Sequence, residues 1–281
     1  MENYTNVPED IFDDGFKSKQ VVKRTFDEKK YLNARLAKGE TQKTTVIRPI
    51  LTMDLSDNRL KFAIPVHIHK IKLTKEQESM SASGYKTFMC IADPHADGDG
   101  HCPLCEKKRE LYKKAETATD PVEKKALEDE AKKYVSRVAY IVRCIDRNNE
   151  ADGIKYWRIL SNLKYGCLYD RIKNLYLERL QEHVNIFSYE DGKDLRISVT
   201  QGPNNTIIES ISDAARQTPL AESVEQKEQW INDDTDWRNF FPYKSKEYLQ
   251  IVADGFAPFY DKEKGLFVPY IPKQDDFPTE Y

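Results

Sequence analysis

One segment governs the prediction of this fold: Cys90-Ile-Ala-Asp-Pro-His95-Ala-Asp-Gly-Asp-Gly-His101-Cys102-Pro-Leu-Cys105. It holds three of the five cysteines and two of the five histidines of the chain. Zinc prefers four thiolate or imidazole ligands at tetrahedral corners, and a Cys-x-x-Cys turn supplies two of them from one knuckle. Because Cys102 and Cys105 have this spacing and Cys90 adds a third thiolate, the segment predicts one structural zinc ion completed by a histidine.

Two other metal or redox sites contain a similar cysteine pair, and the sequence disfavours both. A thioredoxin-like pair lies between a strand and a helix of a βαβ unit, whereas a Gly/Asp/His-rich loop precedes Cys102 here. A zinc deaminase requires Pro-Cys-x-x-Cys with an upstream His-x-Glu. This chain has Cys-Pro-x-Cys, and none of its histidines is followed by x-Glu. The metal is therefore predicted to be structural, and the chain is not predicted to be an enzyme.

The residues alone leave four candidates for the fourth ligand. His95 and His101 lie in the cysteine-containing loop, whereas His67 and His69 lie in a predicted strand before it. In that strand apolar residues alternate with other residues, so His67 and His69 are expected on one face. The two remaining cysteines, Cys144 and Cys167, fall in apolar elements and are predicted to be buried.

Composition predicts a soluble cytoplasmic protein with one large or two modest domains. The chain has 281 residues, 39% of them hydrophobic and 32% charged. It has no apolar run of the roughly twenty residues that a membrane span needs, and its first residues do not resemble a secretory signal. An odd number of cysteines without an export signal favours a reducing compartment.

Charge is distributed unevenly along the chain. Residues 222–281 contain seven Lys/Arg and thirteen Asp/Glu, a net charge of −6. Since the whole chain carries −3, residues 1–221 carry +3. A basic body with an acidic end can bind a polyanion and also screen that binding site.

The order of the elements predicts an α+β fold, with a small β-barrel elaborated by insertions. Capping residues and Gly39 predict a helix from Thr25 to Gly39. The other predicted helices are 106–118, 121–133 and 163–180. The predicted strands are 44–51, 60–73, 85–91, 135–146, 153–160, and a closing hairpin of 184–189 with 194–200.

Aromatic and basic residues interleave across one predicted hairpin and the helix that follows it. Single-stranded nucleic acid favours this combination, because unpaired bases stack on rings and phosphates pair with Lys and Arg. Adjacent strand residues face opposite ways, so at most one of Tyr156 and Trp157 can face a groove. The interleaved residues are Tyr134, Arg137, Tyr140, Lys155, Tyr156, Trp157, Arg158, Lys164 and Tyr165.

Together these features resemble the zinc-containing single-stranded DNA-binding proteins of T-even phages, the helix-destabilising replication proteins. The resemblance covers roughly residues 20–220. It is carried by Lys23-Arg24-Thr25 before a short helix, by Val46-Ile47-Arg48, by Phe62-Ala63-Ile64 leading to a histidine, and by Cys90 and Cys102-Pro103-Leu104-Cys105. The chain departs from the family in its longer intervals between ligands and in 201–206, which lacks aromatic residues.

The resemblance implies an OB-type barrel with a zinc-binding subdomain and helical insertions. It implies an N-terminal arm (1–40), a DNA-binding core (41–221) that includes the zinc subdomain (about 67–134), and an acidic aromatic C-terminal region (222–281). The implied zinc ligands are His69, Cys90, Cys102 and Cys105. The implied DNA contacts are Tyr134, Arg137, Tyr140, Lys155, Trp157, Arg158 and Lys164.

The implied function is sequence-tolerant, cooperative binding of single-stranded DNA in phage DNA replication, recombination and repair, in the cytoplasm of the host bacterium. Lys23, Arg24 and Thr25 would mediate contacts between neighbouring copies on DNA. The acidic C-terminus would recruit replication proteins. The alternative is a zinc-stabilised protein-interaction module in a replication or transcription complex, with the tyrosines in its core.

Overall fold

The computed structural model describes residues 28–54, 56–97, 99–161, 167–203 and 206–271. Its main sheet contains seven strands, which are β1 (Gln42–Ile50), β4 (Ile64–Lys72), β5 (Tyr85–Met89), β6 (Ser136–Asp146), β7 (Ile154–Leu160), β8 (Leu195–Gln201) and β9 (Ile207–Asp213). Two separate hairpins are formed by β2 (Thr52–Asp54) with β3 (Arg59–Lys61), and by β10 (Pro258–Asp261) with β11 (Leu266–Pro269).

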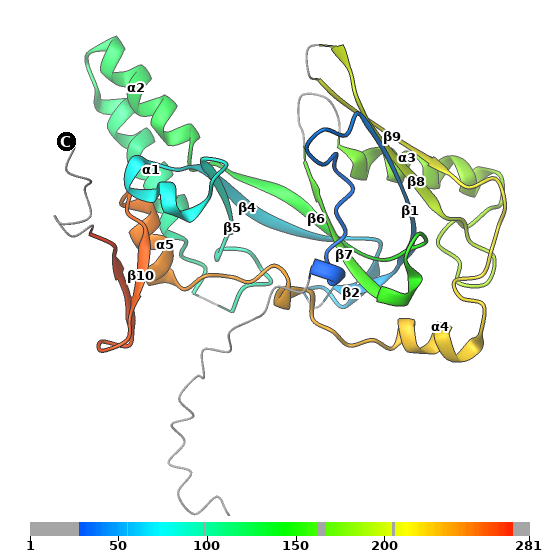
Figure 1. Cartoon of the computed structure of the whole chain (residues 1–281). Coiled ribbons are helices and arrows are strands. Elements are labelled where there is room, and N and C mark those ends of the chain that lie inside the picture. The colour runs from blue at the N-terminus through cyan, green and yellow to red at the C-terminus, as the bar shows by residue number, and fades with distance from the viewer. Residues whose placement is uncertain (1–27, 55, 98, 162–166, 204–205, 272–281) are drawn as a thin grey trace, which may run out of the picture.

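The fold is α+β, as predicted, and its main sheet is antiparallel and open in the described residues. The strand order is β5-β4-β6-β1-β8-β9, and β7 also pairs with β6. Figure 1 shows the sheet running between two groups of helices. One group contains α1 (Pro103–Thr117), α2 (Pro121–Lys132) and α5 (Lys246–Ala253), and the other contains α3 (Leu168–Gln181) and α4 (Val224–Ile231).

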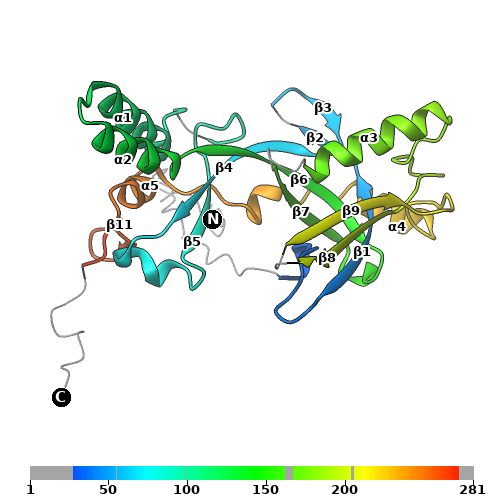
Figure 2. The same cartoon turned by 90° about the horizontal axis from the view of Figure 1, so that it is seen from above.

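Strand β6 connects the two ends of the sheet. Its first half pairs with β4 through residue 141, and its second half pairs with β1 from residue 143 onward. The same residues of β6 also pair with β7, which therefore lies along the opposite edge. Viewed from above, β6 runs from the side of α1 and α2 toward β1 (Figure 2).

Alternation along the strands builds separate apolar cores. On β7, Tyr156 and Trp157 point to opposite faces, and both are buried because each face is covered by other elements. Trp157 belongs to the first core, which contains Ile47, Val142, Cys144, Cys167 and Ile172. Tyr156 belongs to the second core, which contains Ile64, Ile141, Trp230, Trp237 and Phe241. A third core, near α1 and α5, contains Phe88, Cys90, Leu104, Leu111 and Leu249.

The C-terminal region contributes to two of these cores. Trp230 and Trp237 pack in the second core, and Leu249 and Val252 pack in the third. Arg143 of β6 donates hydrogen bonds to the backbone carbonyls at the end of α4. The described part of the acidic region, residues 222–271, is therefore built into the body of the protein.

The predicted closing hairpin of 184–189 with 194–200 is wrong. Residues 184–189 form turns instead of a strand, and Ile186 and Phe187 are both buried, which an alternating strand on one core would not allow. The true partner of β8 is β9, whose apolar residues are largely exposed and gave no alternation.

The predicted helix over 25–39 is also wrong in its described part, where only the 3-10 turn η1 (Glu28–Lys30) is helical. After η1 the chain is extended, and Leu32 and Ala34 alternate into the first core. Leu32 donates a backbone hydrogen bond to the carbonyl of Tyr156. Pairing beside β7 therefore replaces the helix that local capping signals predict.

Helix α2 begins at the predicted cap. The Asp120 side chain accepts a hydrogen bond from the backbone N–H of Val122 at 2.9 Å, and Pro121 occupies the first helical position. No helix in the described ranges is both long and apolar enough to cross a membrane.

Replacing this cap should destabilise α2 measurably. We expect Asp120→Ala to lower the free energy of unfolding by about 1 kcal/mol, because one orphan N–H of the first turn loses its acceptor. Urea denaturation followed by circular dichroism measures the change. Asp120→Asn, which keeps an acceptor oxygen, should stay within a few tenths of a kcal/mol of the parent. Equal losses in both variants would contradict the capping role.

Candidate metal centre and basic cleft

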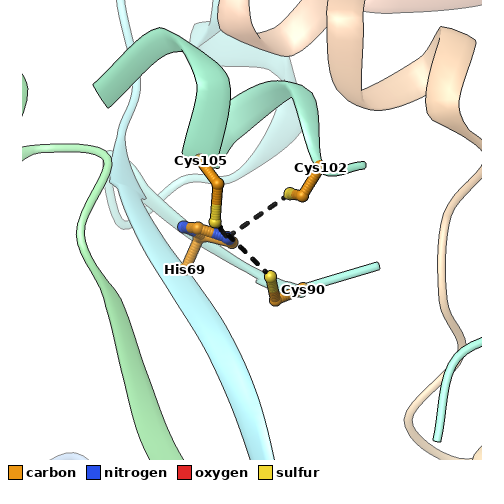
Figure 3. Close-up of side chains that lie close together, drawn as sticks. All are labelled: His69, Cys90, Cys102 and Cys105. Carbon is orange, nitrogen blue, oxygen red and sulfur yellow. Dashed lines mark hydrogen bonds between the residues drawn. The ribbon is translucent and has the colours of Figure 1, made fainter. Parts of the chain in front are cut away.

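Four residues from separate elements converge at one end of the sheet (Figure 3). His69 lies on β4, and Cys90 follows the end of the adjacent strand β5. Cys102 occupies the cap position of α1, and Cys105 lies in the first turn of that helix. The antiparallel pairing of β4 with β5 and the start of α1 thus bring the four side chains together.

The spacing of these side chains fits a four-coordinate metal. The Sγ atoms of Cys90 and Cys105 are 3.7 Å apart, and His69 Nε2 lies 3.5 Å from Cys102 Sγ and 3.6 Å from Cys105 Sγ. A tetrahedron with metal–sulfur bonds of about 2.3 Å and metal–nitrogen bonds of about 2.0 Å has sulfur–sulfur edges of about 3.8 Å and sulfur–nitrogen edges of about 3.5 Å. These three distances match the edges of such a tetrahedron, and all four ligand atoms lie within 4.8 Å of one another.

The surroundings orient the histidine and concentrate negative charge. His69 is fully buried, and its Nδ1 hydrogen-bonds the backbone carbonyl of Tyr134 at 3.0 Å, which directs Nε2 toward the sulfurs. Burial lowers the pKa of His69, but hydrogen bonds and charges from Cys102 and Cys105 outweigh it and raise the pKa to about 9. The pKa of Cys102 is lowered, chiefly by the thiols of Cys105 and Cys90. This environment suits a bound cation.

The other candidate histidines lie outside the cluster. His67 is exposed and contacts Asp93, and His101 is exposed and contacts Glu106. Of the four histidines that the residues left open, the structure therefore places His69 with the cysteines, as the resemblance implied.

His95 takes a different role, which the sequence did not reveal. Its Nδ1 lies 2.7 Å from a carboxylate oxygen of Asp93, and its Nε2 lies 2.8 Å from one of Asp54. Both carboxylates are fully buried. Since both ring nitrogens face acceptors, the ring is an imidazolium that donates two hydrogen bonds. It ties the loop after Cys90 to the β2–β3 hairpin.

Three of the predicted DNA contacts are buried. Tyr134 belongs to the third core and Trp157 to the first, with 7% and 5% of their surfaces exposed. Lys155 is buried and forms ion pairs with Asp146 and Asp152. These side chains offer no open surface to a nucleic acid, because both faces of the β6–β7 hairpin are covered and Tyr134 packs in the third core.

The remaining predicted contacts are distributed differently. Tyr140 is half-buried, and its ring stacks on that of Tyr169 with centroids 3.8 Å apart. Arg137 is exposed, and Arg158 is half-buried. The other predicted contact, Lys164, and the predicted cooperativity residues Lys23, Arg24 and Thr25 lie outside the described residues.

Arg158 lines a small cavity. The cavity lies between the C-terminal region and the end of the sheet that carries His69 and the three cysteines, which is called the metal end here. The cavity, of about 160 Å³, is called the basic pocket here, and it lies between β5, β7 and the segment 240–244. None of the residues that line it is acidic. The lining residues are Lys86, Thr87, Phe88, Met89, Arg158, Phe240, Phe241, Pro242 and Lys244. Sequence reasoning missed all but Arg158, because the other residues lie in distant segments and 240–244 lies within an acidic region.

Two of the three cations of the basic pocket, Lys86 and Arg158, are partly buried, whereas Lys244 is exposed. Burial, with a smaller contribution from Lys244, lowers the pKa of Lys86. Burial also lowers the pKa of Arg158, whose Nε is buried without a hydrogen-bond partner among the described residues. The Arg158 guanidinium lies over the Phe241 ring at 5.4 Å. Because Lys86 and Arg158 are partly desolvated and no carboxylate lines the pocket, the site favours an anionic ligand.

Two comparisons with known proteins return no match. No family model matches the sequence, and no curated protein matches it either. The metal cluster and the basic pocket therefore carry the functional argument.

Proposed function

We propose that this chain binds single-stranded DNA cooperatively and without sequence preference, and that it catalyses no reaction. The observation that carries the proposal is the basic pocket, in which Lys86, Arg158 and Lys244 meet the half-buried ring of Phe240 with no acidic neighbour in the lining. Phosphates pair with such cations, and unpaired bases stack on such rings at about 1–3 kcal/mol per base.

Contacts to bases through rings and to phosphates through cations would allow the protein to bind single-stranded DNA of any sequence. Every base has a π-face, so stacking on Phe240 would not distinguish bases, and ion pairs with phosphates carry no sequence information. Phe240 is half-buried and stacks on Tyr156 with centroids 5.0 Å apart, which holds its ring in a fixed orientation. Binding is thus expected to depend strongly on salt and weakly on sequence.

In this proposal the metal is one structural zinc ion. Three thiolates and one imidazole are ligands that zinc prefers, and a closed four-ligand site leaves no position for substrate. Cys90 follows β5, and β5 carries Lys86 of the basic pocket. Zinc would therefore hold one wall of the pocket in place and contribute folding energy.

The family resemblance supplies the wider context of the proposal. The open sheet would correspond to an OB-type barrel elaborated by the zinc subdomain, acting in phage DNA replication, recombination and repair in the host cytoplasm. Lys23, Arg24 and Thr25 would link neighbouring copies on DNA. Because residues 222–271 are packed into the body, recruitment of replication proteins would fall to residues 272–281.

A second candidate function is a zinc-stabilised protein-interaction module. It is favoured by the burial of Tyr134 and Trp157, which act as core residues and not as stacking platforms. This alternative gives no account of the desolvated cations in the basic pocket.

A salt titration tests the proposed function. We expect Lys86→Ala and Lys244→Ala each to weaken binding of fluorescent oligo-dT about tenfold at low salt, which corresponds to about 1.4 kcal/mol. Each variant should also reduce the slope of log K against log salt by about 0.7, the value for one lost phosphate contact in single strands. Fluorescence anisotropy measures both quantities.

Lys125→Ala provides the matched control, because Lys125 is exposed on α2, away from the lining of the pocket. It should bind oligo-dT like the parent. Absence of binding by the parent protein at low salt would overturn the proposed function and leave the interaction module as the better explanation.

A further inference from the structure

The N-terminal sequence has a charge pattern opposite to that of the basic pocket. The first sixteen residues contain five carboxylates and no Lys or Arg. Four of these carboxylates, Glu9, Asp10, Asp13 and Asp14, flank the apolar pair Ile11-Phe12. An aromatic ring among closely spaced carboxylates offers the two features of single-stranded DNA that a basic, ring-lined pocket recognises.

The described chain begins beside the basic pocket. The ring of Tyr31 contacts that of Phe241 with centroids 5.6 Å apart, and the Arg158 guanidinium donates a hydrogen bond to the Tyr31 hydroxyl. The backbone of Tyr31 also forms an isolated parallel β-bridge with Tyr156 of β7. Figure 1 shows this first stretch (blue) next to β7.

The chain is long enough to return to the pocket. Eleven residues separate Phe16 from Glu28, and an extended chain spans up to about 3.3–3.6 Å per residue, or about 36 Å in total. Residues 9–16 can therefore reach the pocket of the same molecule. The acidic segment 272–281 follows β11, which lies at the metal end of the sheet, and contains three carboxylates.

We propose that residues 9–16 occupy the basic pocket when no nucleic acid is bound, so that the N-terminus inhibits its own binding site. The carboxylates of this segment pair with Lys86 and Lys244, and Phe12 contacts the rings of the pocket. This inference rests on the proposed function, since it names the regulation of that site. A competing segment reduces the apparent affinity by the fraction of molecules whose pocket is open.

The first experiment measures occupancy directly, without nucleic acid. A carbodiimide joins a carboxylate to a lysine amine as an amide and takes up the released water as a urea, so it couples only groups in contact. In the full-length protein we expect cross-links from residues 9–14 to Lys86 or Lys244, identified by mass spectrometry. Cross-links from this segment only to Lys17, Lys19 or Lys23, or cross-links to the pocket only from residues 275–280, would overturn the proposal.

The second experiment measures the regulation. The variant Glu9→Gln/Asp10→Asn/Asp13→Asn/Asp14→Asn should bind oligo-dT at least fivefold more tightly than the parent at low salt, the lower end of typical coupling between sites. The control Glu110→Gln/Glu116→Gln/Glu178→Gln/Glu209→Gln makes the same change in net charge at exposed positions. This control should gain less affinity for oligo-dT than the N-terminal variant does.

The outcomes separate the two proposals. If the parent binds oligo-dT and both quadruple variants bind with equal affinity, the N-terminal inhibition is wrong and the proposed function stands. If the parent and both variants fail to bind oligo-dT, the proposed function is wrong, and the cross-linking result alone decides whether the acidic segment occupies the pocket.

Discussion

If the cluster of His69, Cys90, Cys102 and Cys105 holds zinc as proposed, removal of the zinc is expected to unfold the end of the protein that contains the cluster. The ligands Cys90 and Cys102 are themselves members of the third core, which also contains Leu104 and Leu249. Without a cation, three sulfurs would remain crowded around one imidazole. Binding of structural zinc in zinc-finger peptides supplies about 10–16 kcal/mol, more than the stability of most domains. The free energy lost when the metal is removed should therefore exceed the free energy of unfolding of this part of the protein.

Hydrogen exchange measured before and after a strong chelator checks this expectation. Amides of α1 and β5 should lose protection, whereas those of β1 and β8, at the other end of the sheet, should retain more of theirs. Cys105→Ser should reproduce the effect and lower the metal content measured by mass spectrometry. Cys167→Ser is the control, because Cys167 lies in the first core, remote from the cluster. Full protection of α1 in metal-free protein would contradict the structural role.

Loss of His95 should also be strongly destabilising. Its imidazolium lies between the fully buried carboxylates of Asp54 and Asp93. Removing one partner of a buried ion pair leaves an uncompensated charge and typically costs about 3–5 kcal/mol. We therefore expect His95→Ala to lower the free energy of unfolding by about that amount. His101→Ala, at an exposed position, should change it by less than about 0.5 kcal/mol.

The interaction of His95 with Asp54 and Asp93 should also make the free energy of unfolding depend on pH. Hydrogen bonding to Asp93 is the main cause that raises the pKa of His95 above its usual value, while burial opposes it. A group whose pKa is higher in the folded than in the unfolded state stabilises fully below the unfolded value, about 6.5, and stops stabilising as pH rises through the folded value.

The stabilisation that His95 provides to the folded state should therefore be complete near pH 6. It should be lost as the pH rises through the pKa of His95 in the folded protein. Urea denaturation midpoints measured upward from about pH 6 should fall more steeply in the parent than in His95→Gln, which cannot titrate. Parallel curves for the two proteins would exclude this contribution.

The sequence predicted best those features that depend on local patterns. The Cys-x-x-Cys knuckle identified the cluster because both cysteines lie at the start of one helix, where their spacing is fixed. Asp120 and Pro121 located the start of α2, since capping involves only neighbouring residues. The long strands β4 and β6 were also predicted, β4 because its apolar residues alternate and β6 because it is rich in β-branched and aromatic residues.

Features that depend on distant segments could not be predicted in the same way. The alternation of Tyr156 and Trp157 predicted opposite faces, but only the packing of the C-terminal region shows that both faces are covered. The basic pocket joins β5, β7 and 240–244, and no local pattern relates these segments. The pairing of His95 with Asp54 bridges forty-one residues and likewise has no local signal.

The continuity of β6 limits how the protein can move. Since β6 carries ladder hydrogen bonds to β4 in one half and to β1 in the other, swinging the metal end away from the rest would break consecutive backbone pairs. Segment 240–244, by contrast, contains no helix or strand in the described structure. Continuous pairing along β6 therefore favours a fixed position for the metal end, and any widening of the basic pocket is expected to come from displacement of segment 240–244.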